Sequence, residues 1–66
     1  MGRTLTTVEK HGQRIKHKTV GTEAEIIGTS QIGYAGELLQ GFRVRCLGDG
    51  TERFLPFRIV EQYELV

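Results

Sequence analysis

The sequence predicts an all-β domain, a small barrel of about five antiparallel strands with one short 3-10 turn. Nine glycines bound short β-rich runs along the 66 residues, which is typical of a barrel or sandwich with tight turns. No window of ten or more residues has the 3.6-residue apolar period of a helix. A chain of this length allows one domain with one small core.

The N-terminal part divides into a Thr-rich segment and the start of the barrel. Residues 1–10 are extended in propensity, and we expect either a flexible segment or an extra edge strand there. The barrel is expected over residues 11–66. Its first strand covers 13–17 with Ile15 pointing inward, and Gly21 marks a turn or bulge after it.

The middle of the chain predicts a second strand followed by a loop. Residues 24–27 form this strand. Ile26 and Ile27 cannot both point inward on a regular strand, so one of them is expected at a bulge or at the rim. Residues 28–36 are expected to form a polar loop. A short continuation follows, which Gly41 is expected to break.

The clearest strand covers 42–47, because apolar residues and arginines alternate there. The inward side is expected to carry Phe42, Val44 and Cys46, and the outward side Arg43 and Arg45. Asp49-Gly50 then predicts a hairpin. A two-residue turn would place Arg45 opposite Phe54, with Leu55 inward and Phe54 outward. A longer turn or a bulge would reverse the faces, and the sequence leaves both open.

A short turn and a last strand close the chain. Residues 56–60 begin with proline and predict a single 3-10 turn, and 62–66 predict the final strand. The expected core combines the inward residues of all these segments: Ile15, Ala24, Ile26, Phe42, Val44, Cys46, Leu55, Ile59 and Leu65.

Few residues of the sequence are candidates for a catalytic or metal-binding role. The single cysteine, Cys46, cannot form an internal disulfide, and we expect a buried, unreactive thiol in a reducing cytoplasm. His11 and His17 lack the further ligands of a metal site, and the scattered acids suit neither magnesium nor acid–base catalysis. We therefore expect no enzyme, no metal and no cofactor. The N-terminus has no apolar segment of a signal peptide, and no apolar run is long enough to span a membrane, so no membrane contact is expected.

Charge is unevenly distributed along the chain. Residues 1–18 carry five basic side chains and one acid, a net charge of +4. Residues 19–66 carry four arginines and seven acids, a net charge of −3. A basic opening before an acidic body is compatible with an electrostatic arm or with an ordinary solvated surface.

One spacing pattern extends over most of the chain. It begins Gly-x-x-apolar-x-His-x-x-x-Gly and continues through an apolar strand, a hairpin strand ending in glycine, a short turn and a final strand. Its positions are Gly12, Ile15, His17 and Gly21, then 24–27, 43–46 with Gly48 and Gly50, 56–60 and 63–66. On these residues the chain resembles the Tudor-like, SH3-fold domain at the C-terminus of UvrD-type repair helicases. More loosely, it is similar to the polymerase-interacting domain of CarD-type transcription regulators.

The resemblance implies a fold and a class of partner. The fold is an SH3-like barrel of the Tudor/KOW type, with His17 as a structural corner residue. The partner is RNA polymerase or another nucleic-acid machine. The chain departs from the pattern at Glu23, where those families have a second glycine, so the first corner between strands is expected to differ.

The first functional hypothesis is a non-enzymatic, protein-binding adaptor associated with transcription or DNA repair. It rests on the resemblance and on arginine beside aromatic residues, which often anchor interfaces. The candidate residues are Arg43, Arg45, Arg53, Phe54, Phe57 and Arg58.

Two alternatives stay open. Direct DNA or RNA binding would use phosphate contacts from Arg14, Lys16 and Lys18 with the sheet arginines, and base stacking on Tyr34 or Phe54. A small inhibitor of a host protein, for example one encoded by a phage, would also suit a chain this short.

Overall fold

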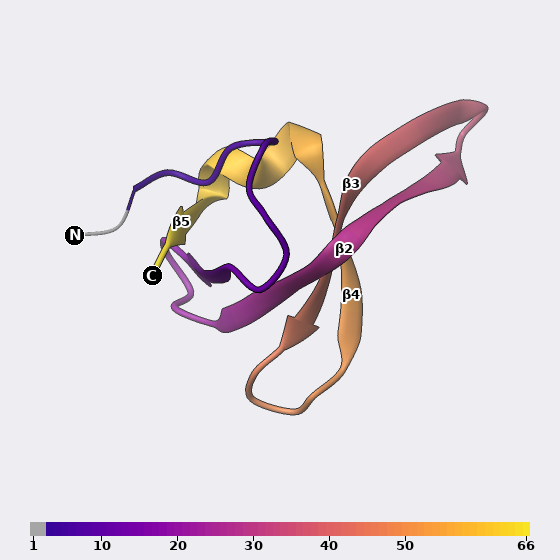
Figure 1. Ribbon diagram of the computed structural model, residues 1–66. Helices are drawn as coiled ribbons and strands as arrows, with labels where there is room; N and C mark the ends of the chain where they lie inside the picture. Colours follow the sequence, from indigo (N-terminus) through magenta and orange to yellow (C-terminus); the bar gives the residue numbers. More distant parts are fainter. Residues whose placement is uncertain (1–2) are drawn as a thin grey trace.

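The computed structural model describes residues 3–66 and confirms an all-β domain. Its elements follow in the order β1 (Arg14–His17), β2 (Glu23–Tyr34), β3 (Glu37–Cys46), β4 (Glu52–Pro56), the 3-10 helix η1 (Phe57–Gln62) and β5 (Tyr63–Leu65). Figure 1 shows strands that curl around a common interior, with a long β2–β3 ribbon projecting from it.

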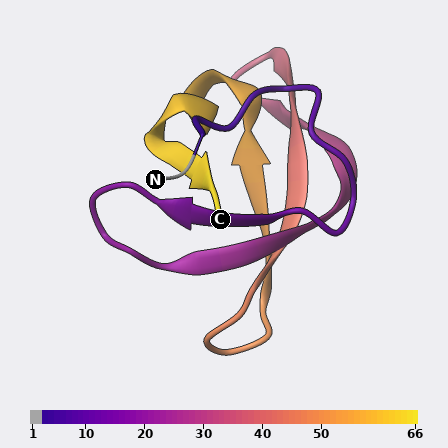
Figure 2. The ribbon, with the colours of Figure 1, turned by 60° about the vertical axis from the view of Figure 1, so that its left-hand side comes forward.

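The strands form one antiparallel sheet in the order β4-β3-β2-β1-β5. In this sheet β2 pairs with two strands: its first residues pair with β1, and nearly its whole length pairs with β3. The helix η1 contacts β3, β4 and β5, and it connects the two edges of the curled sheet (Figure 2). This arrangement is a small, barrel-like domain, as the sequence predicts.

The alternation of apolar residues correctly predicts most of the core. Seven expected residues are buried: Ile15, Ala24, Ile26, Phe42, Val44, Leu55 and Leu65. The prediction of a buried Cys46 is wrong, because this last residue of β3 lies at the open end of the barrel and is half-buried. Ile59 is also only half-buried and packs against the core from η1.

Two buried residues, Leu5 and Val60, were not expected. In the 3-10 helix, residues three apart share a face, so Phe57 and Val60 point the same way and Ile59 lies beside them. Phe57 meets Phe42 edge to face, with ring centroids 4.9 Å apart. The expected 3-10 turn is therefore confirmed, although it begins one residue later and runs longer than 56–60.

Leu5 is buried because the N-terminal segment runs beside β5. The Leu5 N–H donates to the Tyr63 carbonyl at 3.0 Å, and the Leu65 N–H donates to the Arg3 carbonyl at 2.6 Å. Thr4 forms an isolated bridge with Glu64. Residues 3–5 thus lie as a short extended segment along the sheet edge, while residues 1 and 2 of the expected 1–10 segment lie outside the described part.

The predicted bulge is present at the two consecutive isoleucines. The β2–β3 register shifts between Ile26 and Gly28, so Ile27 is the extra residue. Ile26 is buried and Ile27 is half-buried. A bulge increases local twist and redirects the strand, and here it lies between the barrel and the projecting ribbon.

The prediction of a polar loop over 28–36 is wrong. Instead β2 continues to Tyr34 and pairs with β3 residue by residue up to Tyr34–Glu37. Ala35 and Gly36 form the turn with positive φ angles of 52° and 78°. Both central residues of a type I′ turn need positive φ. We call residues 29–40 the arm, and the rest of the described chain the body.

Gly41 does not break β3, which contradicts the prediction. It lies within the strand and pairs with Pro56. A Cβ at this position would collide with the Leu55 carbonyl and with the tip of the Phe54 ring. Glycine is needed there because β4 and Phe54 pack against the backbone.

The β3–β4 hairpin has a longer turn than Asp49-Gly50 alone. The observed register pairs Arg45 with Glu52 and Arg43 with Phe54. A two-residue turn would have paired Arg45 with Phe54, so the partner of Arg45 differs by two residues. A shift of two preserves the faces. Leu55 is therefore buried, as the shorter turn would also have placed it, and Phe54 lies half-buried on the outer face.

Candidate functional site

The outer face of the sheet carries a row of alternating charges. Arg14 of β1 lies opposite Glu25 of β2, which lies opposite Arg45 of β3, which lies opposite Glu52 of β4. Opposite charges in such cross-strand positions stabilise a sheet. We call these four residues the charge row. Two of the expected phosphate-binding residues therefore face acidic neighbours of their own chain.

Arg43 also contacts a member of the charge row. Its guanidinium contacts a Glu52 carboxylate oxygen at 2.6 Å, with about half of each side chain exposed. This hydrogen bond, with the positive charge of Arg43 and more weakly of Arg45, lowers the pKa of Glu52. Phe54 lies opposite Arg43 on this face. The structure thus brings Arg43, Arg45 and Phe54 together, as the sequence suggested.

Basic side chains near the N-terminus also have polar or acidic neighbours within the chain. Lys16 lies between Glu23 of β2 and Glu64 of β5. The Lys18 ammonium donates to the Thr4 hydroxyl at 2.9 Å. This face therefore alternates in sign, whereas a dedicated nucleic-acid surface is a contiguous basic footprint.

The remaining candidates are dispersed. Arg53 lies opposite Val44, hence on the other face of β4 from Phe54. Phe57 packs on Phe42, and Arg58 is exposed on η1. Tyr34 is 63% exposed at the tip of the arm. The ten candidates do not form one site.

Arg53 borders a cavity of about 460 Å³ at the mouth of the barrel. The core residues Ala24, Val44 and Leu55 form part of its wall, together with Cys46 and Tyr63. Burial, and secondarily the neighbouring Cys46, raises the pKa of Tyr63.

His17 has the structural role expected of a corner residue. Its Nδ1 accepts hydrogen bonds from the N–H groups of Thr19 and Val20, at 3.1 and 3.0 Å. Its ring meets Tyr63 edge to face at 4.9 Å. These contacts hold the β1–β2 turn, where Gly21 has a φ of 85°.

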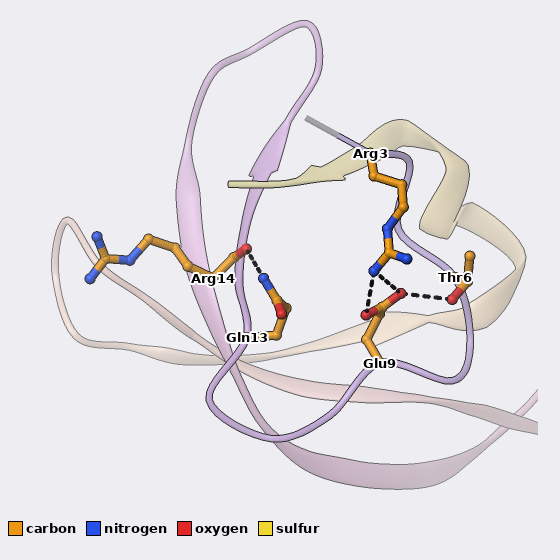
Figure 3. Close-up of polar contacts among 5 residues, drawn as sticks. All are labelled: Arg3, Thr6, Glu9, Gln13 and Arg14. Carbon is orange, nitrogen blue, oxygen red and sulfur yellow. Dashed lines mark hydrogen bonds and ion pairs between the residues drawn. The ribbon is translucent and has the colours of Figure 1, made fainter. Parts of the chain in front are cut away.

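A polar cluster fixes the N-terminal segment (Figure 3). Arg3 contacts both carboxylate oxygens of Glu9 at 3.3 Å, and the Thr6 hydroxyl donates to Glu9 at 2.9 Å. The Gln13 amide donates to the Arg14 carbonyl, while the Arg14 side chain points away from this cluster. These bonds connect residues of the N-terminal loop to one another, and they pair the Arg3 side chain with an acid of its own segment.

Apart from Tyr34, the exposed apolar residues of the arm were not among the candidates that the sequence suggested. Ile32, Tyr34 and Leu38 are 41%, 63% and 62% exposed, and Leu39 is half-buried. Each residue of the arm is exposed or half-buried. Glu37 is the one charged residue among its twelve. The signal available was the near absence of charge over 28–40 in a chain that is 26% charged.

The arm has only two strands. Pairing of β4 with β3 ends at Gly41–Pro56, and pairing of β1 with β2 ends at Arg14–Glu25. Ile32 lies opposite Leu39 and Tyr34 opposite Glu37, so these four share one face of the ribbon. An isolated two-stranded ribbon is only marginally stable in water, so an apolar one needs a covering surface to be well ordered.

Comparisons with known proteins leave the family open: the chain matches no family model, no curated protein and no solved structure. Residues 3–66 contain no group of three or more His, Cys, Asp or Glu side chains that could hold a metal ion. Within the same residues, no helix has the length and apolar character needed to cross a membrane.

Proposed function

We propose that this protein is a non-enzymatic protein-interaction module and that the arm is its main contact element. The observation that carries the proposal is the exposure of Ile32 and Tyr34 on one face of a nearly uncharged ribbon, whose other face exposes Leu38. Interface centres are depleted in charge and enriched in aromatic residues. Exposed apolar residues gathered on one projecting element indicate a contact surface, whereas single scattered ones do not.

Phe54 and Arg43 extend this contact surface onto the body. Phe54 covers Gly41, where the arm joins the body, and it lies opposite Arg43. Arginine and aromatic residues are common anchors of interfaces. The proposed surface therefore runs from Tyr34 along the face of Ile32 and Leu39 to Phe54.

The alternating charges weigh against direct nucleic-acid binding. Phosphate contacts need basic side chains that are free to replace counterions. Arg14, Arg45 and Lys16 lie opposite acids of the sheet, and Arg43 contacts Glu52. We therefore rank a protein partner first. The sequence resemblance makes RNA polymerase and repair helicases the first proteins to test, and the single cysteine favours a cytoplasmic setting.

Site-specific photocrosslinking tests the proposal. A photoreactive phenylalanine analogue at Tyr34 should capture a defined protein in cells that express the chain. Val20 is the matched control, because it is 70% exposed and apolar but lies on the body. Identical products from both positions, or none from Tyr34, would contradict the arm as the contact element.

A salt titration separates the nucleic-acid alternative. Binding to random duplex or single-stranded DNA should be weak at low salt. A tight interaction that weakens steeply with salt would favour phosphate binding instead.

A further inference from the structure

One edge of the arm presents regularly spaced backbone groups. Tyr34 and Glu37 close the two-residue turn, so they form a hydrogen-bonded pair, and such pairs alternate along an antiparallel ladder. Consequently the N–H and C=O groups of Thr29, Gln31 and Gly33 point away from β3. The same alternation directs the Cys46 N–H away from β2, and that group donates to the Thr51 carbonyl of the β3–β4 hairpin at 2.7 Å.

This edge of β2 is covered only near the body. β1 pairs with β2 over Glu23–Glu25, and Gly12 and Gln13 bond the backbone of Ile26. Beyond Ile26, no segment within residues 3–66 pairs with this edge. Its outward N–H and C=O groups are therefore free to pair with an added strand.

The edge lacks the features that normally prevent strand addition. Natural proteins protect exposed edges with lysines, prolines, inward charges or bulges. Residues 28–34 contain no charged residue and no proline, and the bulge lies before them at Ile27. Glu37 is on the other strand, across the ribbon from this edge.

We propose that the β2 edge of the arm pairs antiparallel with the same edge of a second copy of this chain. The two-fold axis passes at Gln31, so that Gln31 faces Gln31 of the second copy. Thr29 then faces Gly33, and Ser30 faces Ile32. This inference rests on the proposed function, because it identifies the first partner of the arm.

The chemistry of the seam suits a second copy. An isologous contact brings each residue against a surface of the same composition, so a charged edge would repel itself whereas this neutral edge does not. Gly33 is exposed and leaves room opposite Thr29. Two ribbons joined in this way form a four-stranded sheet, which exceeds the three strands needed for independent stability.

The seam is short, so the dimer is expected to be weak. Stable interfaces bury about 20–30 residues a side, and this seam engages fewer. We expect a reversible dimer with a dissociation constant of about 10–500 μM. Sedimentation velocity on the full chain, from about 10 μM to 1 mM, measures it.

Gln31 and Gln40 provide a matched pair of variants. They are the same residue, both exposed, and directly opposite each other, but their backbones face opposite edges of the arm. Gln31→Lys places two like charges on the two-fold axis and should weaken the dimer at least about tenfold. Gln40→Lys puts the same charge on the β3 edge and should leave the dimer intact.

Charge exchange completes the test. Q31E alone should weaken the dimer as Q31K does, whereas an equimolar mixture of Q31K and Q31E should dimerise more tightly than either variant alone, because opposite charges meet at the axis. If either charge disturbs the fold, as judged by circular dichroism, the variants Q31P and Q40P repeat the comparison. Proline removes the outward N–H group, so Q31P should weaken the dimer and Q40P should not.

A chain that stays monomeric at 1 mM overturns this inference. Equal losses from Q31K and Q40K, or no rescue in the mixture, overturn it as well. The photocrosslinking test at Tyr34 is independent of it: a monomer that still captures another protein through Tyr34 keeps the proposed function and excludes the second copy as the partner.

Discussion

Two isoleucines of one strand show how the body and the arm differ. Ile26 of β2 is completely buried, and Ile32, six residues further on the same strand, is 41% exposed. At Ile26 the strand has neighbours on both sides, and the side chain belongs to the buried core. At Ile32 the strand has one neighbour and no layer above it. The same residue type thus supports the core in the body and forms a contact surface in the arm.

Truncating these two isoleucines should give the largest contrast. Ile26→Ala removes buried methyl groups from the core and should lower the free energy of unfolding by about 2–5 kcal/mol. Ile32→Ala should change it by no more than about 0.5 kcal/mol, as for surface positions. Urea denaturation followed by circular dichroism measures both at one low protein concentration, where the chain is monomeric.

One result would contradict this contrast between Ile26 and Ile32. If Ile32→Ala costs as much as Ile26→Ala in the monomer, the arm is part of the cooperative core and is not a free surface. A 66-residue domain has little stability in reserve. Ile26→Val, which removes a single methyl group, is therefore the milder variant if Ile26→Ala unfolds.

The body could be predicted because its residues obey simple alternation. Phe42, Val44 and Leu55 lie on strands with one buried face, and a period of two identifies that face without knowledge of the neighbours. The arm could not be predicted in this way. Both of its faces are solvated, so Ile32 and Leu38 follow no useful period, and Ala35-Gly36 lacks the Asn-Gly or Asp-Gly signature of a type I′ turn.

Two glycines should give the second contrast. A Cβ at Gly41 would collide with the Leu55 backbone, whereas a Cβ at Gly33 would meet no atom within 4 Å. Gly41→Ala should therefore destabilise the protein by about 1–3 kcal/mol through overpacking. Gly33→Ala, on the same ribbon and without a positive φ angle, should stay within about 0.5 kcal/mol.

Thermal unfolding of both glycine variants measures this difference. A neutral Gly41→Ala would mean that β4 and Phe54 do not press on β3 where the arm begins. Since Phe54 belongs to the proposed contact surface, photocrosslinking at Tyr34 in the Gly41→Ala background would then show whether its position matters for binding.

The charged candidate residues show that cross-strand neighbours cannot be predicted without knowing the register of the strands. The alternation of residues 42–47 correctly predicts a common outward face for Arg43 and Arg45, because that prediction needs only the period of one strand. Their acidic neighbours Glu25 and Glu52 lie on other strands and become neighbours only through the bulge at Ile27 and the longer β3–β4 turn. A shift of two residues leaves every face unchanged but replaces every cross-strand partner.

Body and arm also differ in how they should respond to acid, which is the smallest effect expected. Bonds from the Thr51 N–H and hydroxyl lower the pKa of Asp49, and the Arg43 contact lowers that of Glu52. A carboxyl whose pKa is lower in the folded state stabilises the fold above its unfolded pKa. That contribution is lost as the pH falls through the folded value. Stability of the monomer should therefore decline modestly below about pH 4.5, the ordinary value for Glu52.

Glu52→Gln and Asp49→Asn identify the source of this decline. Each variant should be slightly less stable than the original at pH 7, and each should show a smaller loss between pH 7 and pH 3. Both carboxyls are solvent-exposed, so screening keeps the effects small, and 1 M salt should reduce the Glu52 difference. The seam proposed between two arms, from Thr29 to Gly33, contains no titratable group. Its dissociation constant should therefore stay constant over the pH range in which the body is folded. A dimer that dissociates between pH 7 and pH 5, while the circular dichroism spectrum is unchanged, would place charged residues of the body in the contact and move the seam away from Gln31.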